Sequence, residues 1–108
     1  MSEVESLKQF VLDQLESVEG ISTKRMFGGI GFFQEGKMFG MIGSELFRLK
    51  ADDSNRYRFT ERGIKAFMSN DKKKGLPYFT VPADILEDRD QFLIWCSESI
   101  SIAHKKKG

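Results

Sequence analysis

The sequence predicts an α+β protein, a two-layer structure in which helices pack on an antiparallel sheet of about five strands. Three observations lead to this prediction. Apolar residues recur at helical spacing near both ends of the chain, and two tight-turn signals in the middle imply a meander of strands. The length of 108 residues suits a single domain, spanning residues 1–108. The expected order is helix, three strands, helix, two strands, helix.

The first helix is predicted over residues 2–18. Ser2 and Glu5 have the spacing of a capping box, which satisfies free backbone N–H groups at a helix N-terminus. Gly20 stands where a helix terminator is common. The apolar residues of the buried face are Val4, Leu7, Val11, Leu15 and Val18.

Two-residue turns at Glu35-Gly36 and Gly43-Ser44 predict the three-stranded meander. Side chains alternate across a strand, so the pairing that these turns impose divides the residues between two faces. The pairs include Phe33 with Met38, Phe39 with Arg48, and Met41 with Leu46. One face carries Gly29, Gly31, Phe33, Met38, Gly40, Ile42, Phe47 and Leu49, and the other carries Ile30, Phe32, Phe39, Met41 and Leu46, with Arg48 and Lys50 towards one end.

The second half of the chain is expected to add a helix and two strands. A short helix over 52–62 ends at Gly63, because glycine readily adopts the left-handed conformation of a helix C-terminus. Strands are predicted over 64–68 and 76–81. Pro77 places the second of these at a sheet edge or at the start of a strand, since proline has no N–H to donate.

The final helix is predicted over 88–105. Asp88 and Gln91 have capping-box spacing at its start. The residues that share one face are Phe92, Trp95, Cys96, Ser99, Ile100 and Ala103.

Composition indicates a cytoplasmic globular protein. Hydrophobic residues make up 40% of the chain and charged residues 31%, and no apolar run approaches the ~20 residues that a membrane-spanning helix needs. The acidic N-terminus lacks the pattern of a secretory signal. The lone cysteine, Cys96, is typical of a reducing compartment. A net charge of +1 indicates no overall attraction to nucleic acid or anionic lipid.

The segment Arg25-Met26-Phe27-Gly28-Gly29, which continues as Ile30-Gly31-Phe32, resembles the TfoX N-terminal domain family. This family is named for a regulator of bacterial natural competence that is also called Sxy. The resemblance continues through residues 36–39, 45–52 and 77–82. It covers nearly the whole chain, which is therefore expected to be a stand-alone N-terminal domain.

The resemblance implies a fold and a function. The fold is a two-layer α+β arrangement similar to secretion chaperones and YjbR-like proteins. The implied function is regulation of transcription by a non-enzymatic module, with a protein partner such as the cyclic AMP receptor protein. Arg25, Met26, Phe27, Gly28 and Gly29 are the residues that carry the family motif.

Motifs for small-molecule chemistry are weak. The spacing Gly31, Gly36, Lys37 matches part of a phosphate-binding loop, but Met38 replaces the required hydroxyl and a hairpin follows in place of a helix. Cys96 and His104 are eight residues apart along one helix, too far to act together directly. We therefore expect no cofactor, no metal site and no catalytic residue.

One predicted sheet face is a candidate partner surface. If helices cover the glycine-bearing face, the opposite face forms an apolar patch for a protein partner or for a homodimer. The alternative is that a helix covers this second face. The residues of the candidate surface are Ile30, Phe32, Phe39, Met41 and Leu46.

Direct nucleic-acid binding is an alternative function, and a small enzyme of unknown reaction is another. Basic residues beside sheet aromatics are typical of single-strand binders, although lysine runs also occur in ordinary solvated loops. The candidate nucleic-acid contacts are Arg48, Lys50, Lys72, Lys73 and Lys74.

Overall fold

The computed structural model describes residues 3–26, 28–66 and 77–105. The elements follow in the order α1 (Glu3–Gln14), β1 (Ile21–Met26), β2 (Gly29–Gln34), β3 (Lys37–Gly43), β4 (Leu46–Lys50), α2 (Tyr57–Thr60), β5 (Tyr78–Thr80), α3 (Ala83–Leu86) and α4 (Arg89–His104).

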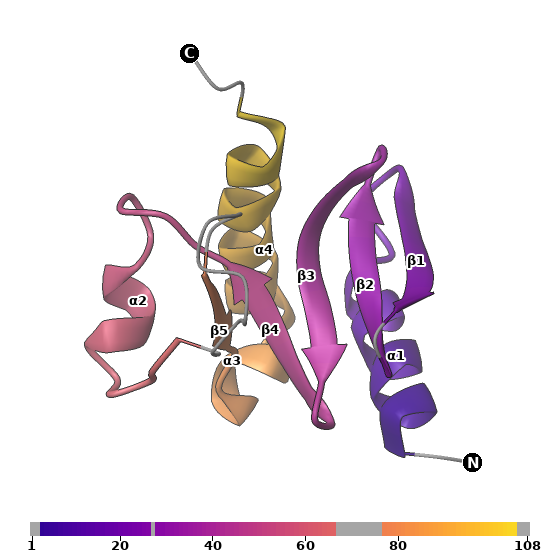
Figure 1. Cartoon of the computed structure of the whole chain (residues 1–108), viewed down its shortest axis with the longest axis horizontal. Helices are drawn as coiled ribbons and strands as arrows, with labels where there is room; N and C mark the ends of the chain where they lie inside the picture. Colours follow the sequence, from indigo (N-terminus) through magenta and orange to yellow (C-terminus); the bar gives the residue numbers. More distant parts are fainter. Residues whose placement is uncertain (1–2, 27, 67–76, 106–108) are drawn as a thin grey trace.

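The five strands form one antiparallel sheet in the order β1-β2-β3-β4-β5. The two longest helices, α1 and α4, pack on the same side of this sheet, with α4 lying along β3 and β4 (Figure 1). The predicted α+β class and the antiparallel sheet are confirmed. Every strand connection between β1 and β4 is a short turn, so the chain lays down four neighbouring strands in succession.

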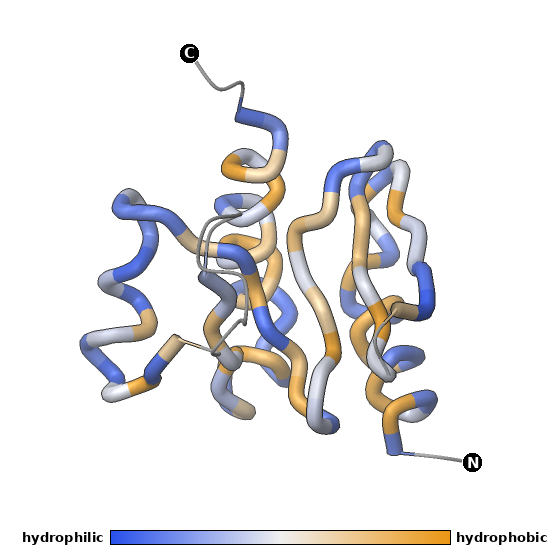
Figure 2. Tube along the Cα trace, viewed as in Figure 1, coloured by the Kyte–Doolittle hydropathy of each residue, from blue (hydrophilic) through white to orange (hydrophobic). Residues whose placement is uncertain are grey.

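Two strands differ from the prediction. Strand β1 occupies residues 21–26, which the predicted order left outside the sheet. Its sequence is largely polar because it lies at an edge, and Figure 2 shows a hydrophilic stretch there beside the more hydrophobic β2 and β3. The strand expected over 64–68 contributes only an isolated bridge between Ala66 and Phe79, and residues 67 and 68 lie outside the described residues.

Two tight turns set the register of the central strands. The β2–β3 turn uses Glu35 and Gly36, with φ angles of 48° and 84°, as predicted. The β3–β4 turn uses Ser44 and Glu45, with φ angles of 53° and 65°, which is one residue beyond the predicted Gly43-Ser44. Positive φ at both central positions matches the twist of a two-residue hairpin. As a result, Leu46 pairs with Gly43 and not with Met41.

A β-bulge in β3 changes which face its side chains occupy. Phe33 pairs with Met38 as predicted, but Phe32 pairs with Gly40, so Phe39 is an extra residue between the two pairs. The alternation of side chains therefore breaks between Phe39 and Gly40. The predicted faces were wrong for this reason: Gly29, Gly31, Phe33 and Met38 lie on one face, while Gly40, Ile42, Phe47 and Leu49 lie on the other with Ile30, Phe32 and Phe39.

The core lies between the sheet and the helices and is built around aromatic rings. Phe32 meets Phe47 edge to face, with ring centroids 5.3 Å apart, and Phe47 lies 5.6 Å from Phe92 of α4. Further along, Phe59 stacks on Phe79 at 4.9 Å. Such contacts add to the burial of a large apolar area, so the face that carries these rings is the one that the helices must cover.

Helix α4 begins as predicted. The side chain of Asp88 accepts a hydrogen bond from the backbone N–H of Gln91 at 3.2 Å. Of the six residues expected on its inner face, Phe92, Trp95, Cys96 and Ser99 are buried, and Ile100 and Ala103 are half-buried. The Ser99 hydroxyl donates to the Lys50 carbonyl oxygen at 2.7 Å, which joins α4 to the end of β4.

The helix predicted over 52–62 is shorter in the structure. Only Tyr57–Thr60 form α2, and hydrogen-bonded turns occupy the flanking residues. Gly63, with φ of 76°, ends this segment, because its N–H bonds to Thr60 while that of Ile64 bonds to Phe59. The Arg58 guanidinium bonds to both carboxylate oxygens of Glu98 at 2.7 Å, which fastens the segment to α4.

The burial of Phe39 predicts a large effect of substitution. Its side chain is 0% exposed, so Phe39→Ala should lower the free energy of unfolding by about 3–5 kcal/mol. The control is Leu46→Ala, because Leu46 is 47% exposed and should lose less than about 1 kcal/mol. Urea denaturation of both variants measures the difference, and equal losses would contradict the assigned faces.

The lowered pKa of Asp52 predicts that the stability of the fold depends on pH. The hydrogen bond from the Lys105 Nζ at 2.8 Å and those from Ser54 lower the pKa of the Asp52 carboxyl from 3.8 to about 2. A lowered pKa stabilises the fold above about pH 4, and this stabilisation is lost as the pH falls through about 2. Asp52→Asn should therefore be less stable than the wild type at neutral pH and equally stable near pH 2. Urea denaturation at both pH values tests this, and a constant difference would contradict it.

Candidate functional site

The candidate site is the sheet face opposite α1 and α4, which we call the open sheet face (Figure 1). Within the described part of the chain no helix packs on it. Its apolar residues are half-buried against one another, except Leu46, which is 47% exposed. The side chains on this face are those of Ser22, Lys24, Met26, Phe33, Met38, Met41, Leu46, Arg48, Lys50, Tyr78 and Thr80.

Cross-strand pairing places these residues in rows. One row runs through Lys24, Gly31, Met41 and Arg48 to Thr80, across all five strands. Directly opposite residues share a face, so the charged residues Lys24 and Arg48 flank Gly31 and Met41 in this row, and the uncharged Thr80 ends it.

Glycine allows the methionine and phenylalanine side chains to lie flat on the sheet. A Cβ atom at Gly31 would lie 2.7 Å from the Met26 sulfur and 3.1 Å from the Phe33 ring. The absence of a side chain at Gly31 therefore lets Met26 and Phe33 cover the strand. These two side chains therefore form part of an apolar layer on the open sheet face.

The partner surface expected from the sequence is corrected by the structure. Ile30, Phe32 and Phe39 are 2%, 0% and 0% exposed and lie in the core, so they cannot contact a partner. Met41 and Leu46 do lie on the open sheet face. The helices cover the phenylalanine-rich face, because burying its rings removes more apolar area from water than burying the glycine-rich face would.

The residues that sequence reasoning missed on this face include Met26, Phe33 and Met38 of its apolar layer, and Lys24 and Tyr78 beside them. Phe33 and Met38 were assigned to the face that helices would cover, and Met26 lies in the unpredicted strand β1. A signal was present, because Phe33 and Met38 were correctly paired beside Gly31. The prediction did not include the bulge at Phe39. This bulge puts the Phe33–Met38 pair on the face opposite to Gly40 and Ile42.

The candidate nucleic-acid contacts are not arranged as expected. Arg48 is 6% exposed and its guanidinium donates to the Gly43 carbonyl oxygen, and burial lowers its pKa. The Lys50 ammonium lies 5.9 Å from the centre of the Tyr78 ring, and burial lowers the pKa of Lys50. The aromatics expected beside them, Phe32 and Phe39, are in the core. Lys72, Lys73 and Lys74 lie outside the described residues.

Most of the family motif serves the β1–β2 connection. Arg25 bonds to Glu5 of α1 at 2.5 Å, which ties the edge strand to the helix layer. Met26 lies on the open sheet face, and Gly28 adopts φ of 76° in the turn. A Cβ atom at Gly29 would lie 2.1 Å from the backbone oxygen of Ile42. Phe27 lies outside the described residues.

The weak motifs acquire structural explanations. Gly31 lies in β2 and Gly36 in a hairpin turn, so a strand, and not a helix, follows the sequence that resembled a phosphate loop. Cys96 is buried and burial raises the pKa of its thiol. His104 is exposed, with its Nε2 2.7 Å from the Gln34 Oε1. Among the described residues, no group of three His, Cys, Asp or Glu side chains is placed to hold a metal ion.

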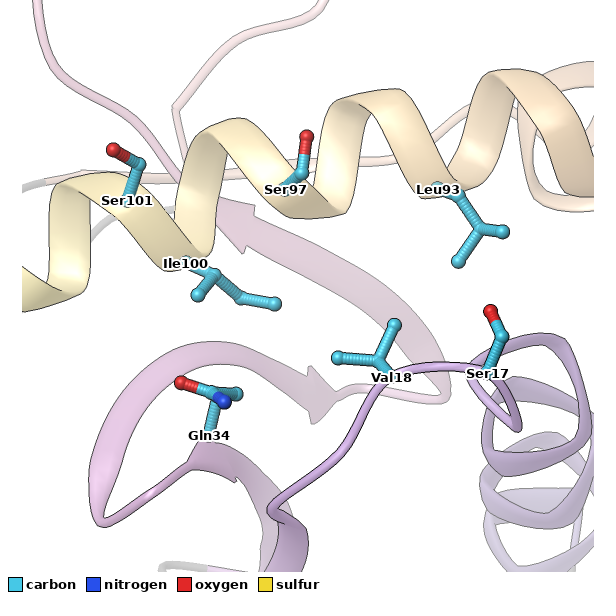
Figure 3. Close-up of a pocket in the computed structure, with 7 residues that line it drawn as sticks. All are labelled: Ser17, Val18, Gln34, Leu93, Ser97, Ile100 and Ser101. Atoms are coloured by element: carbon cyan, nitrogen blue, oxygen red, sulfur yellow. The ribbon is translucent and has the colours of Figure 1, made fainter.

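A shallow groove on the opposite side of the molecule is a weaker candidate. It encloses about 440 Å³ between α4 and the segment that joins α1 to β1. Figure 3 shows Leu93 and Ile100 extending toward Val18, while the hydroxyls of Ser97 and Ser101 point away from the groove. The groove therefore offers a small apolar strip and few convergent polar groups, which is too little to define a ligand.

The fold and site define a class: a small two-layer α+β domain with one face of its sheet covered by helices and the other open. The model of the TfoX N-terminal domain matches residues 13–103. Because this match covers most of the 108 residues, the chain belongs to the TfoX N-terminal domain family. A search of curated proteins finds no match. No described helix is long and apolar enough to cross a membrane.

Replacement by alanine should destabilise the fold more at Gly29 than at Gly28. Gly29→Ala should lower the free energy of unfolding by roughly 3 kcal/mol or more, because its Cβ atom would collide with the backbone of β3. At Gly28 nothing lies within 4 Å of a Cβ atom, so Gly28→Ala should cost only the ~1–2 kcal/mol of a positive φ. Thermal and urea denaturation measure the stability of both variants. A Gly29 variant as stable as the Gly28 variant would contradict the close strand approach.

Proposed function

We propose that this chain is a non-enzymatic regulatory module of the competence-regulator class, which acts on transcription by binding a protein partner at its open sheet face. Membership of the TfoX N-terminal domain family supports the regulatory class. A transcription factor such as the cyclic AMP receptor protein is the first candidate partner. The observation that carries the proposal is the half-buried apolar layer on the side of the sheet that α1 and α4 leave open.

The chemistry of this layer favours protein binding. Three of its residues, Met26, Met38 and Met41, are methionines, whose flexible and polarizable side chains adapt to the shape of a partner. Leu46 extends the layer toward the β3–β4 turn and is the most exposed apolar residue on it. Contiguous apolar surface of this kind is typical of interaction sites.

A matched pair of variants tests the proposal. Leu46→Glu places a charge on the open sheet face, and Ile94→Glu places the same charge on the outer surface of α4. The two side chains are 47% and 45% exposed, so both variants should remain folded, as circular dichroism can confirm.

The measurement is capture of proteins from an extract of the host, identified by mass spectrometry. Leu46→Glu should lose about 90% or more of a transcription-related partner, because a buried charge at an interface costs several kcal/mol. Ile94→Glu should retain that partner. The proposal would be refuted if Leu46→Glu captures as much partner as the wild type, or if both variants lose it equally.

A further inference from the structure

We infer that the partner segment that binds the open sheet face is an acidic amphipathic helix. This inference rests on the function proposed above and specifies the chemistry of the partner. Its starting observation is that two lysines outside the core, Lys24 and Lys50, lie on strand positions of this face, whereas none of the described strand positions on it is Asp or Glu. The face is therefore apolar and positively charged, although the whole chain has a net charge of only +1.

The cations flank the apolar layer on two sides. Lys24 lies on β1 and Lys50 lies on β4, with β2 and β3 between them, while the buried Arg48 is held by the Gly43 carbonyl oxygen. Three strand spacings separate the first and fourth strands, a width of about 14 Å. A helix with its side chains is about 10–12 Å across, so one helix fits between the two cationic borders.

The length of the layer also suits a helix. The apolar residues extend from the Phe33–Met38 pair to the row that contains Met26 and Leu46, which is four residues along the strands or about 13 Å. About nine residues of helix cover this length, enough for anchors at positions i, i+3, i+4 and i+7. Carboxylates beside such a stripe would face Lys24 on one border and Lys50 on the other.

A second copy of the chain fits this face poorly. In a face-to-face dimer with two-fold symmetry, the same surface is presented by both copies, so the cations of one copy would meet a face with no carboxylate on its described strand positions. Like charges opposed across an interface cost several kcal/mol. The charge pattern therefore favours an acidic partner over the homodimer expected from the sequence.

A nucleic acid also fits less well than an acidic helix. Single-stranded nucleic acids bind sheets through exposed aromatic rings on which bases stack. Among the described residues of this face only Phe33 and Tyr78 are aromatic, both are half-buried, and the Lys50 ammonium lies over the Tyr78 ring. Most of the layer is methionine and leucine, which match the apolar stripe of a helix.

The test uses two synthetic helical peptides as probes. Both are about 18 residues long, or ~27 Å as a helix, and carry the same leucine stripe. One has glutamate at the polar positions and the other has lysine. Fluorescence anisotropy with the full chain should show the glutamate peptide binding roughly tenfold or more tightly than the lysine peptide at low salt. The difference should shrink at high salt because exposed charges are screened.

Two charge-reversal variants test whether the glutamate peptide binds at the open sheet face. Lys24→Glu should weaken binding of the glutamate peptide about fivefold, since it replaces an attraction with a repulsion at one border of the face. The control is Lys8→Glu, which makes the same change of charge on α1 and should leave binding unchanged.

The inference would be overturned if neither peptide binds, if the lysine peptide binds as tightly, or if both variants weaken binding equally. Displacement of the glutamate peptide by a short single-stranded oligonucleotide, or self-association that Leu46→Glu abolishes, would also overturn it. These outcomes are separate from the extract experiment. If Leu46→Glu loses the partner in the extract experiment but the chain does not prefer the glutamate peptide, the proposed function stands. Only the acidic helix is then refuted.

Discussion

The β-bulge at Phe39 is the constraint on which the arrangement of this domain depends. Without the extra residue, strict alternation would put Phe39 and Ile42 on opposite faces of β3. With it, both side chains reach the helix side and are 0% exposed. The same step leaves Met38 and Met41 on the other side, so one irregularity completes the core and also creates the apolar layer of the open sheet face.

The helices cover the face of the sheet that carries Phe39 and Ile42. Helix α4 lies along β3 and β4 and contributes Phe92 and Trp95 to the ring cluster, while α1 reaches the edge strand through the ion pair of Glu5 with Arg25. Anchors of this kind fix the helix layer on one side. The face that remains carries methionines and lysines, whose long unbranched side chains can adapt their shape more readily than those of the packed core.

The order of most elements could be predicted from the sequence, because capping residues and turn residues act locally. Asp88 with Gln91 marks the start of α4, and Glu35-Gly36 marks the first hairpin. The second turn was misplaced by one residue, since Ser44 and Glu45 adopt positive φ without the glycine that usually signals it. The bulge could not be foreseen at all, because it is favoured by burial of the Phe39 ring in the assembled core, which is not a local property. Because the bulge was missed, residues of β2 and β3 were assigned to the wrong faces, and the candidate surface included buried residues.

The charges on strand β1 have a consequence for how the edge of the sheet can pair with other chains. An edge strand exposes backbone donors and acceptors that invite pairing with strands of other molecules. Lys24 and Arg25 stand side by side in the middle of this edge, one pointing to each face, so any strand that approaches must accommodate charge on both sides. The edge is thereby protected against fibre-like stacking. The partner that we propose would therefore be recognised by the side chains of the open sheet face and not by backbone pairing at this edge.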